Sequence, residues 1–172
     1  MKVRSTVITL FLLAFAAGTV HAAKRVDAPA YRTMTQPEAA KALLQKALTE
    51  AGKGSWERIA VGRVYYLGGM KSEGQAIFDA VLANDPDPSD LFRVARIYRE
   101  AGEWSRAKAL FDRSIQENPK DEKGLAEVGA YYMANGDRAT AEALFDRSFK
   151  LQSEIWATVS AAGGYLGVTP QE

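Results

Sequence analysis

The chain of 172 residues contains no cysteine and only one histidine, His21. It therefore offers no disulfide, no cysteine nucleophile and no zinc site built from His and Cys. An excess of charge is also missing, because 22 basic residues stand against 21 acidic ones. A chain this close to neutrality is not expected to bind nucleic acid or an anionic membrane through its overall charge.

Long apolar runs are equally scarce, and the one present extends from Val7 to Ala17. Lys2 and Arg4 precede it and small residues follow, which predicts a secretory signal cleaved after Ala22. A bilayer span would need about 20 apolar residues, and the absence of cysteine excludes a lipoprotein anchor. We expect a periplasmic or secreted protein with no integral membrane segment after cleavage. Because the signal holds two basic residues, the remaining chain carries 20 basic and 21 acidic residues.

Paired carboxylates are the acid–base groups that remain for catalysis, as in glycoside hydrolysis. The candidates are Asp87 with Asp90 and Asp121 with Glu122. Both pairs fall where helices are predicted to start, and acidic side chains there accept hydrogen bonds from free N–H groups and favour the positive end of the helix dipole. We therefore interpret them as caps and predict no catalytic residue, no enzyme activity, no metal and no cofactor.

An eight-residue segment occurs twice, because residues 107–114 (AKALFDRS) return 34 positions later as residues 141–148 (AEALFDRS). Other positions recur at spacings of 33 or 34. They are Leu44, Phe78, Phe111 and Phe145; Ala40, Gly74, Ala107 and Ala141; Tyr65, Tyr98 and Tyr132; and Gly69, Gly102 and Gly136. A small residue stands three places before each Tyr: Gly62, Ala95 and Gly129. A period of this length is typical of a helical repeat array.

The repeated residues resemble the tetratricopeptide pattern over residues 36–168, in which Gly and Tyr positions are followed by Ala-x-x-x-Phe and a closing Pro. Pro86 and Pro119 supply that Pro in two repeats, whereas Ser153 stands in the third. The opening Trp of the motif is replaced by Arg58, Leu91 and Leu125. The resemblance implies an all-α fold, a right-handed α-solenoid of antiparallel helix pairs with about eight helices.

The register divides the chain into a signal peptide, a flexible leader, a repeat domain and a tail. The predicted segments are 1–22, 23–34, 35–168 and 169–172, with full repeats at about 55–87, 88–121 and 122–155 and half-repeats at 35–52 and 155–168. The predicted helices span about 35–51, 55–67, 72–84, 88–101, 104–117, 122–134, 138–150 and 155–168. The first would be a second helix without its partner, and the last a first helix without its partner.

In such an array the first helix of each pair lines the concave face. The side chains expected there, in chain order, are Trp56, Ile59, Arg63, Tyr66, Phe92, Arg96, Arg99, Ala126, Ala130 and Met133. We predict that the partner binds Trp56, Arg63, Tyr66, Phe92, Arg96, Arg99 and Met133. Arginines beside aromatic surface suit an extended peptide that bears carboxylates. The alternative is that the arginines pair with Glu100, Glu103 or Glu127 and only keep the surface hydrated.

Some members of the family hold a C-terminal peptide in a clamp of Lys, Asn and Arg. The matching positions here carry Ile59, Arg63, Arg96, Ala126 and Ala130. Most of the clamp is absent, so its ligand is not carried over to this chain.

The last predicted helix is apolar for a helix that nothing covers, since terminal repeats usually present a polar outer face. Its large residues are Trp156, Val159, Tyr165 and Leu166. Either they pack inward onto Phe145 and Phe149, or they form an edge for docking or for a homodimer through Trp156, Tyr165 and Leu166.

The sequence thus predicts an exported adaptor that binds a protein or peptide on the concave face. The alternative is a structural or self-associating subunit of an envelope or secretion assembly that docks through its C-terminal helix.

Overall fold

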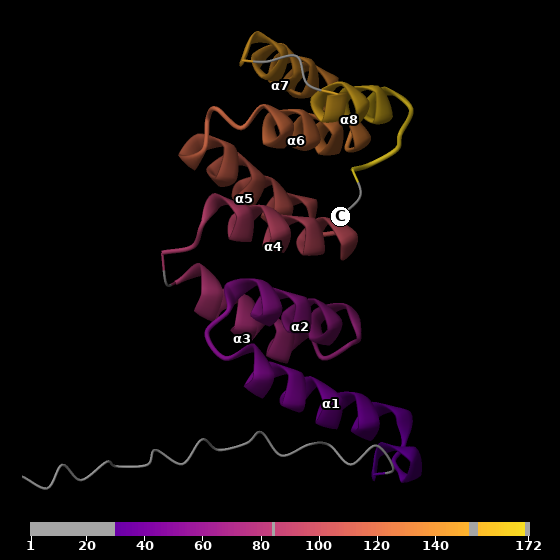
Figure 1. Ribbon diagram of the computed structural model, residues 1–172. Coiled ribbons are helices and arrows are strands. Elements are labelled where there is room, and N and C mark those ends of the chain that lie inside the picture. Colours follow the sequence, from indigo (N-terminus) through magenta and orange to yellow (C-terminus); the bar gives the residue numbers. More distant parts are fainter. Residues whose placement is uncertain (1–29, 84, 152–154, 171–172) are drawn as a thin grey trace, which may run out of the picture.

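The computed structural model describes residues 30–83, 85–151 and 155–170. These residues form a 3-10 helix (Ala30–Thr33) and eight α-helices without a strand, which confirms the predicted all-α helical repeat solenoid (Figure 1). The α-helices are α1 (Gln36–Ala51), α2 (Ser55–Leu67), α3 (Lys71–Leu82), α4 (Pro88–Glu100), α5 (Trp104–Glu117), α6 (Glu122–Ala134), α7 (Arg138–Leu151) and α8 (Ile155–Tyr165). The predicted signal peptide and the leader up to residue 29 lie outside the described residues.

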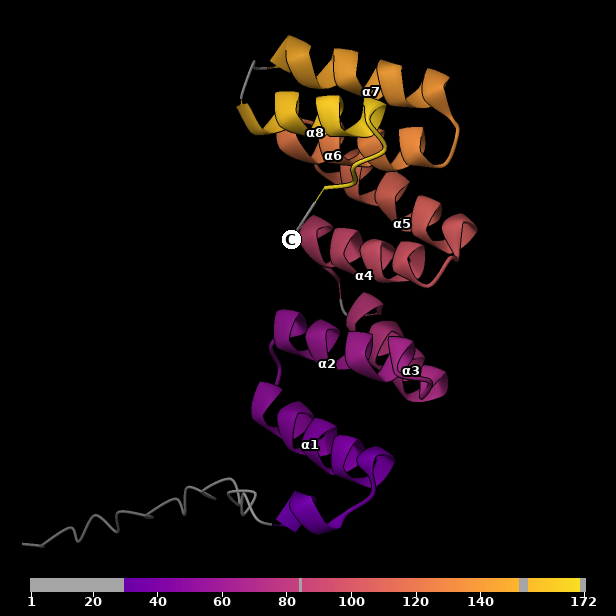
Figure 2. The same ribbon diagram turned by 90° about the vertical axis from the view of Figure 1, so that its right-hand side faces the viewer.

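The helices stack as pairs, α2 with α3, α4 with α5 and α6 with α7, between an unpaired α1 and an unpaired α8 (Figures 1 and 2). Each pair turns at a glycine with a left-handed backbone, and φ is 90° at Gly69, 77° at Gly102 and 85° at Gly136. Residues with a Cβ rarely adopt this conformation, so these glycines end the first helix of each pair. None of the described helices is both long and apolar enough to cross a bilayer.

Within each pair a phenylalanine of the second helix fills the core. Phe78 and Phe111 are fully buried, and Phe145 is 3% exposed. In the first and third pairs the small residue opposite is glycine, and a Cβ added to Gly62 or Gly129 would lie 2.6 Å from the facing ring. The recurring small residue therefore lets the two helices of a pair approach closely.

Neighbouring pairs are connected by a tyrosine on the first helix of the later pair. This tyrosine contacts the same repeat position on the second helix of the earlier pair. The Gln75 amide lies 2.9 Å from the Tyr98 hydroxyl, and the Lys108 ammonium lies 5.3 Å from the centroid of the Tyr132 ring. On α8, the Tyr165 hydroxyl donates to Glu142 at 2.9 Å. Tyr165 thus continues the tyrosine series, and α8 occupies the register of a first helix.

A charged cluster joins the first pair to the second. Glu103, just before α5, accepts hydrogen bonds from the Tyr66 hydroxyl at 2.8 Å and from Arg106 at 2.9 Å, and it forms an ion pair with Lys71. Arg106 also donates to the Tyr98 hydroxyl at 2.8 Å. The hydrogen bond from Lys71, followed by those from Tyr66 and Arg106, lowers the pKa of Glu103 to about 2.

The junction at the other end of the array is apolar. Ala157, Ala161 and Gly164 form the buried face of α8, which packs along α6 (Figure 2). The approach is close, because a Cβ added to Gly164 would lie 3.1 Å from the Cα atom of Ala130. Ala126 and Ala130, expected on the open concave face, are fully buried. Neither residue is therefore open to a partner, and Ala130 lies directly against α8.

Candidate binding groove across α2, α4 and α6

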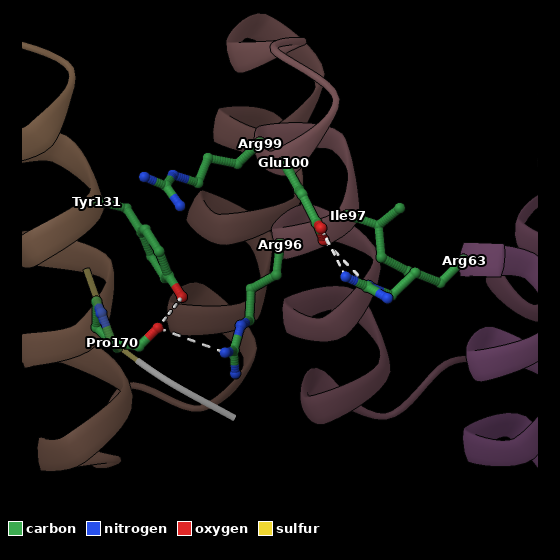
Figure 3. A pocket seen from close by; sticks show the side chains of 7 residues that line it. All are labelled: Arg63, Arg96, Ile97, Arg99, Glu100, Tyr131 and Pro170. Atoms are coloured by element: carbon green, nitrogen blue, oxygen red, sulfur yellow. Dashed lines mark hydrogen bonds and ion pairs between the residues drawn. The ribbon is translucent and has the colours of Figure 1, made fainter. Parts of the chain in front are cut away.

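The open part of the inner face contains a hollow of about 200 Å³ that receives side chains from three first helices. We call it the arginine groove (Figure 3). It is lined by Arg63 of α2, by Arg96, Ile97, Arg99 and Glu100 of α4, by Tyr131 of α6, and by Pro170. A second hollow of about 760 Å³ adjoins it, shares Arg63, Arg96 and Ile97 with it, and extends to Trp56 and Glu127.

Arg63 bridges α2 and α4. Its guanidinium donates two hydrogen bonds to the Glu100 carboxylate, at 3.0 Å from Nε and 2.6 Å from Nη2 (Figure 3). A forked pair of this kind fixes the orientation of both side chains. Arg63 therefore pairs with a glutamate, as the alternative interpretation of the sequence predicted.

Arg96 and Arg99 lie one turn apart on α4. Their surroundings differ from those of Arg63. Within the described residues neither forms an ion pair. The Arg99 guanidinium lies 5.3 Å from the centroid of the Tyr131 ring, and that of Arg96 lies 5.9 Å from the centroid of Phe92. Such contacts hold a cation in place while leaving N–H donors for a ligand.

Two carboxylates, Glu57 and Glu127, line the second hollow, and Glu127 is the buried one. Glu127 is 8% exposed, and its nearest cation is Lys123, with 3.4 Å between Nζ and Oε1. Burial raises the pKa of Glu127, while the charges of Lys123 and Arg96 act against that rise. The negative charge here is therefore less favourable than in water.

Trp56 gives the second hollow an apolar platform. The indole is 59% exposed, and the Arg93 guanidinium lies 3.9 Å from the centroid of its ring. An exposed indole with a stacked cation can accept an apolar or planar group of a ligand.

Of the predicted binding residues, Trp56, Arg63, Arg96 and Arg99 lie around the two hollows, whereas Tyr66, Phe92 and Met133 line neither. Tyr66 is 4% exposed, and its hydroxyl binds Glu103. Phe92 packs edge-on against Phe111, with ring centroids 5.3 Å apart, and Met133 packs against the core. Phe92 instead lines a third hollow of about 260 Å³, together with Arg96 and Glu127.

The sequence analysis did not predict several of the residues that line the hollows. The repeat register could have identified some of them. Val64, Ile97 and Tyr131 occupy one register position in successive first helices, and all three line one of the hollows. Extending the 33- and 34-residue register by one column would have identified them. Pro170 carries no comparable signal, because it lies after the last repeat.

No cluster of His, Cys, Asp and Glu suited to a metal ion occurs within the described residues. The groove instead offers guanidinium donors, aromatic faces and a tyrosine hydroxyl. These groups can bind carbonyl and carboxylate oxygens by hydrogen bonding.

Comparison with protein-family models gave a match to the tetratricopeptide repeat over residues 91–121. This segment covers most of α4 together with α5, and it contains Arg96 and Arg99. Comparisons with curated protein sequences and with solved structures gave no significant match. The family match and the stacked helix pairs together support a tetratricopeptide repeat protein.

Proposed function

We propose that this protein is an exported adaptor whose arginine groove binds an extended peptide segment of a partner protein. A tetratricopeptide repeat suggests a protein interaction module. The observation that supports this site most strongly is the pair Arg96 and Arg99, which lack an ion pair within the described residues and line a hollow beside Tyr131. Arginine and aromatic side chains are enriched among residues that dominate interface energies.

The test is a cross-linked pull-down from the native envelope that compares wild type with an Arg63/Arg96/Arg99→Ala variant. The matched control is Arg113/Arg138/Arg147→Ala, which removes three arginines of α5 and α7 that lie outside both hollows. We expect the partner to be captured by wild type and by the control, but not by the groove variant. Equal capture by all three proteins would overturn groove binding.

Export is part of the proposal and rests on residues 1–22 of the sequence. N-terminal sequencing of the protein from an envelope fraction is expected to begin at Ala23. A chain recovered only from the cytoplasm with Met1 intact would contradict export without affecting the groove.

A second candidate function, docking or self-association through α8, is favoured by its exposed apolar side chains. Ile155 and Trp156 are 70% and 61% exposed, and Leu166, the residue after the helix, is 80% exposed. Inward packing holds in part for Tyr165, whose ring centroid lies 5.9 Å from that of Phe145, but Trp156 and Leu166 remain exposed.

The self-association version predicts a dimer in light scattering that a Trp156/Leu166→Asp variant loses. Ala109→Asp, on the exposed middle of α5, is the control. A monomer at every concentration would remove the dimer and leave only docking to another protein.

A further inference from the structure

The chain that follows α8 returns to the arginine groove. After α8 ends, Gly167 adopts a left-handed backbone with φ of 73°, and the Val168 amide donates to the Gly163 carbonyl at 2.8 Å. The chain then descends past α6 towards α4, as both views show (Figures 1 and 2). Thr169 and Pro170 thereby reach residues about 70 positions earlier in the sequence.

Three groove donors converge on these two residues. The Pro170 carbonyl accepts from the Tyr131 hydroxyl at 3.4 Å and from Arg96 at 3.5 Å (Figure 3). The Thr169 hydroxyl accepts from Arg99 at 3.4 Å. Because proline has no N–H, its carbonyl is its only hydrogen-bonding group, and that group points into the groove. The contacts therefore use the same side chains that the proposed adaptor function assigns to a partner.

The segment between α8 and the groove is itself little buried. Leu166 is 80% exposed and Val168 is 59% exposed, whereas Thr169 and Pro170 are partly buried. Beyond the turn at Gly167, the tail is thus held by the contacts of Thr169 and Pro170 with the groove. These hydrogen bonds of 3.4 to 3.5 Å are longer than the usual range of about 2.7–3.2 Å and are therefore weak, so the docked tail is displaceable.

We propose that Thr169 and Pro170 form an intramolecular occupant of the arginine groove, which a partner peptide must displace. The inference rests on the proposed function of the groove and gives its ligand class. That class is an extended segment in which a backbone carbonyl binds Arg96 and Tyr131, and the hydroxyl of the preceding residue binds Arg99. If the tail fills the groove for about 80–90% of the time, its removal tightens ligand binding about five- to tenfold, because only the open fraction is competent.

Docking can be measured without any partner by paramagnetic relaxation in solution. The chain has no native cysteine, so a nitroxide on Gln171→Cys, next to the docked pair, is the only label. We expect selective signal loss at the amides around Arg99 and Tyr131, and recovery of those signals in the Arg96/Arg99→Ala variant. Absence of the loss, or a loss unchanged in the variant, would overturn the docked tail.

A mixture of two chains separates docking within one molecule from exchange between copies. One chain is ¹⁵N-labelled and carries no nitroxide, and the other carries the nitroxide and is not ¹⁵N-labelled. Broadening in that mixture would overturn the intramolecular form of the proposal.

The ligand class is tested with a peptide of sequence GVTPQE, capped at both ends so that no terminal charge contributes.

Added in excess to the spin-labelled chain, GVTPQE is expected to restore the lost signals, whereas GVAGQE is not. Equal restoration by both peptides, or by neither, would overturn the assigned ligand class. A chain ending at Val168 is expected to bind GVTPQE five- to tenfold more tightly than the full chain, and equal affinity would overturn competition by the tail. Failure of the adaptor function would appear only in the partner pull-down, since none of these measurements includes a partner.

Discussion

The two junctions at opposite ends of the array use the same tyrosine register and different chemistry. Between the first and second pairs, Glu103 collects hydrogen bonds and charge from Lys71, Tyr66 and Arg106. Between α6 and α8, alanine and glycine bring two helices into close contact. The polar junction should therefore depend on pH, whereas the close contact between α6 and α8 should depend mainly on side-chain volume.

The largest loss of stability is expected from a substitution in the core between the two junctions. Phe111 is fully buried and stacks on Tyr131 with ring centroids 4.8 Å apart. We expect Phe111→Ala to lower the free energy of unfolding by about 3–5 kcal/mol, the usual range for a buried Phe. Phe145→Ala, nearer the end, should cost less. Chemical denaturation measures both, and equal losses would contradict a stability built from neighbour contacts.

The apolar junction should be the more sensitive to added volume. Ala130 is fully buried against Gly164, so Ala130→Leu is expected to destabilise by about 1–3 kcal/mol through overpacking. Ala134→Leu is the control, because Ala134 lies on the same helix and is exposed. Thermal unfolding at pH 7 compares the two variants, and similar midpoints would show that α8 does not pack tightly on α6.

The polar junction should respond to loss of charge. Glu103→Gln keeps the shape but weakens the bonds from Lys71 and Arg106, with an expected loss of about 1–2 kcal/mol at pH 7. Glu117→Gln breaks only an exposed ion pair with Arg113, and should cost no more than about 0.5 kcal/mol. Urea denaturation of both variants makes the comparison, and equal losses would reduce Glu103 to an ordinary surface ion pair.

The same carboxylate gives the polar junction a pH dependence. The pKa of Glu103 is about 2 in the folded protein against 4.5 for a free carboxyl, so its contribution is complete above pH 4.5 and is lost as the pH falls towards 2. The slope of stability against pH in this window should be smaller in Glu103→Gln than in wild type. Identical slopes would place the acid sensitivity elsewhere in the chain.

The smallest effect is expected at Glu127, and it should have the opposite sign. Burial raises its pKa above the ordinary 4.5, so the stability that protonated Glu127 contributes is complete below pH 4.5 and is lost as the pH rises from 4.5 towards the raised pKa. Glu127→Gln should therefore raise the melting temperature slightly at pH 7 and remove this slope. A lower melting temperature would mean that the ion pair with Lys123 outweighs the desolvation of the carboxylate.

The 33- and 34-residue register was enough to predict the helices, because every pair repeats the same Phe, Tyr and Gly positions. The predicted ends of the helices differ from those observed by at most three residues. The register could not show that both Tyr65 and Tyr66 are buried, since one lies towards α3 and the other meets the second pair. A helical pattern assigns Tyr66 to the inner face but does not reveal how closely the next pair approaches.

The parts of the site that escaped prediction depend on contacts distant in sequence. Arg63 pairs with Glu100, whereas Arg96 and Arg99 form no ion pair within the described residues. This difference depends on which side chains can reach one another across two helices. The return of Pro170 to the groove depends on the turn at Gly167 after the periodic pattern has ended. Neither leaves a signature in composition or spacing.

The tyrosine that reaches back to the preceding pair meets a neutral amide at Gln75, a cation at Lys108 and an anion at Glu142. A phenol can serve all three, because its hydroxyl both donates and accepts and its ring attracts cations. The residue it meets can therefore change charge from one copy of the motif to the next while the stacking geometry is kept. Both charged residues also pair with an opposite charge one turn away on their own helix, Lys108 with Asp112 and Glu142 with Arg138. The charge is thus balanced within one helix, and the neighbouring helix keeps its tyrosine.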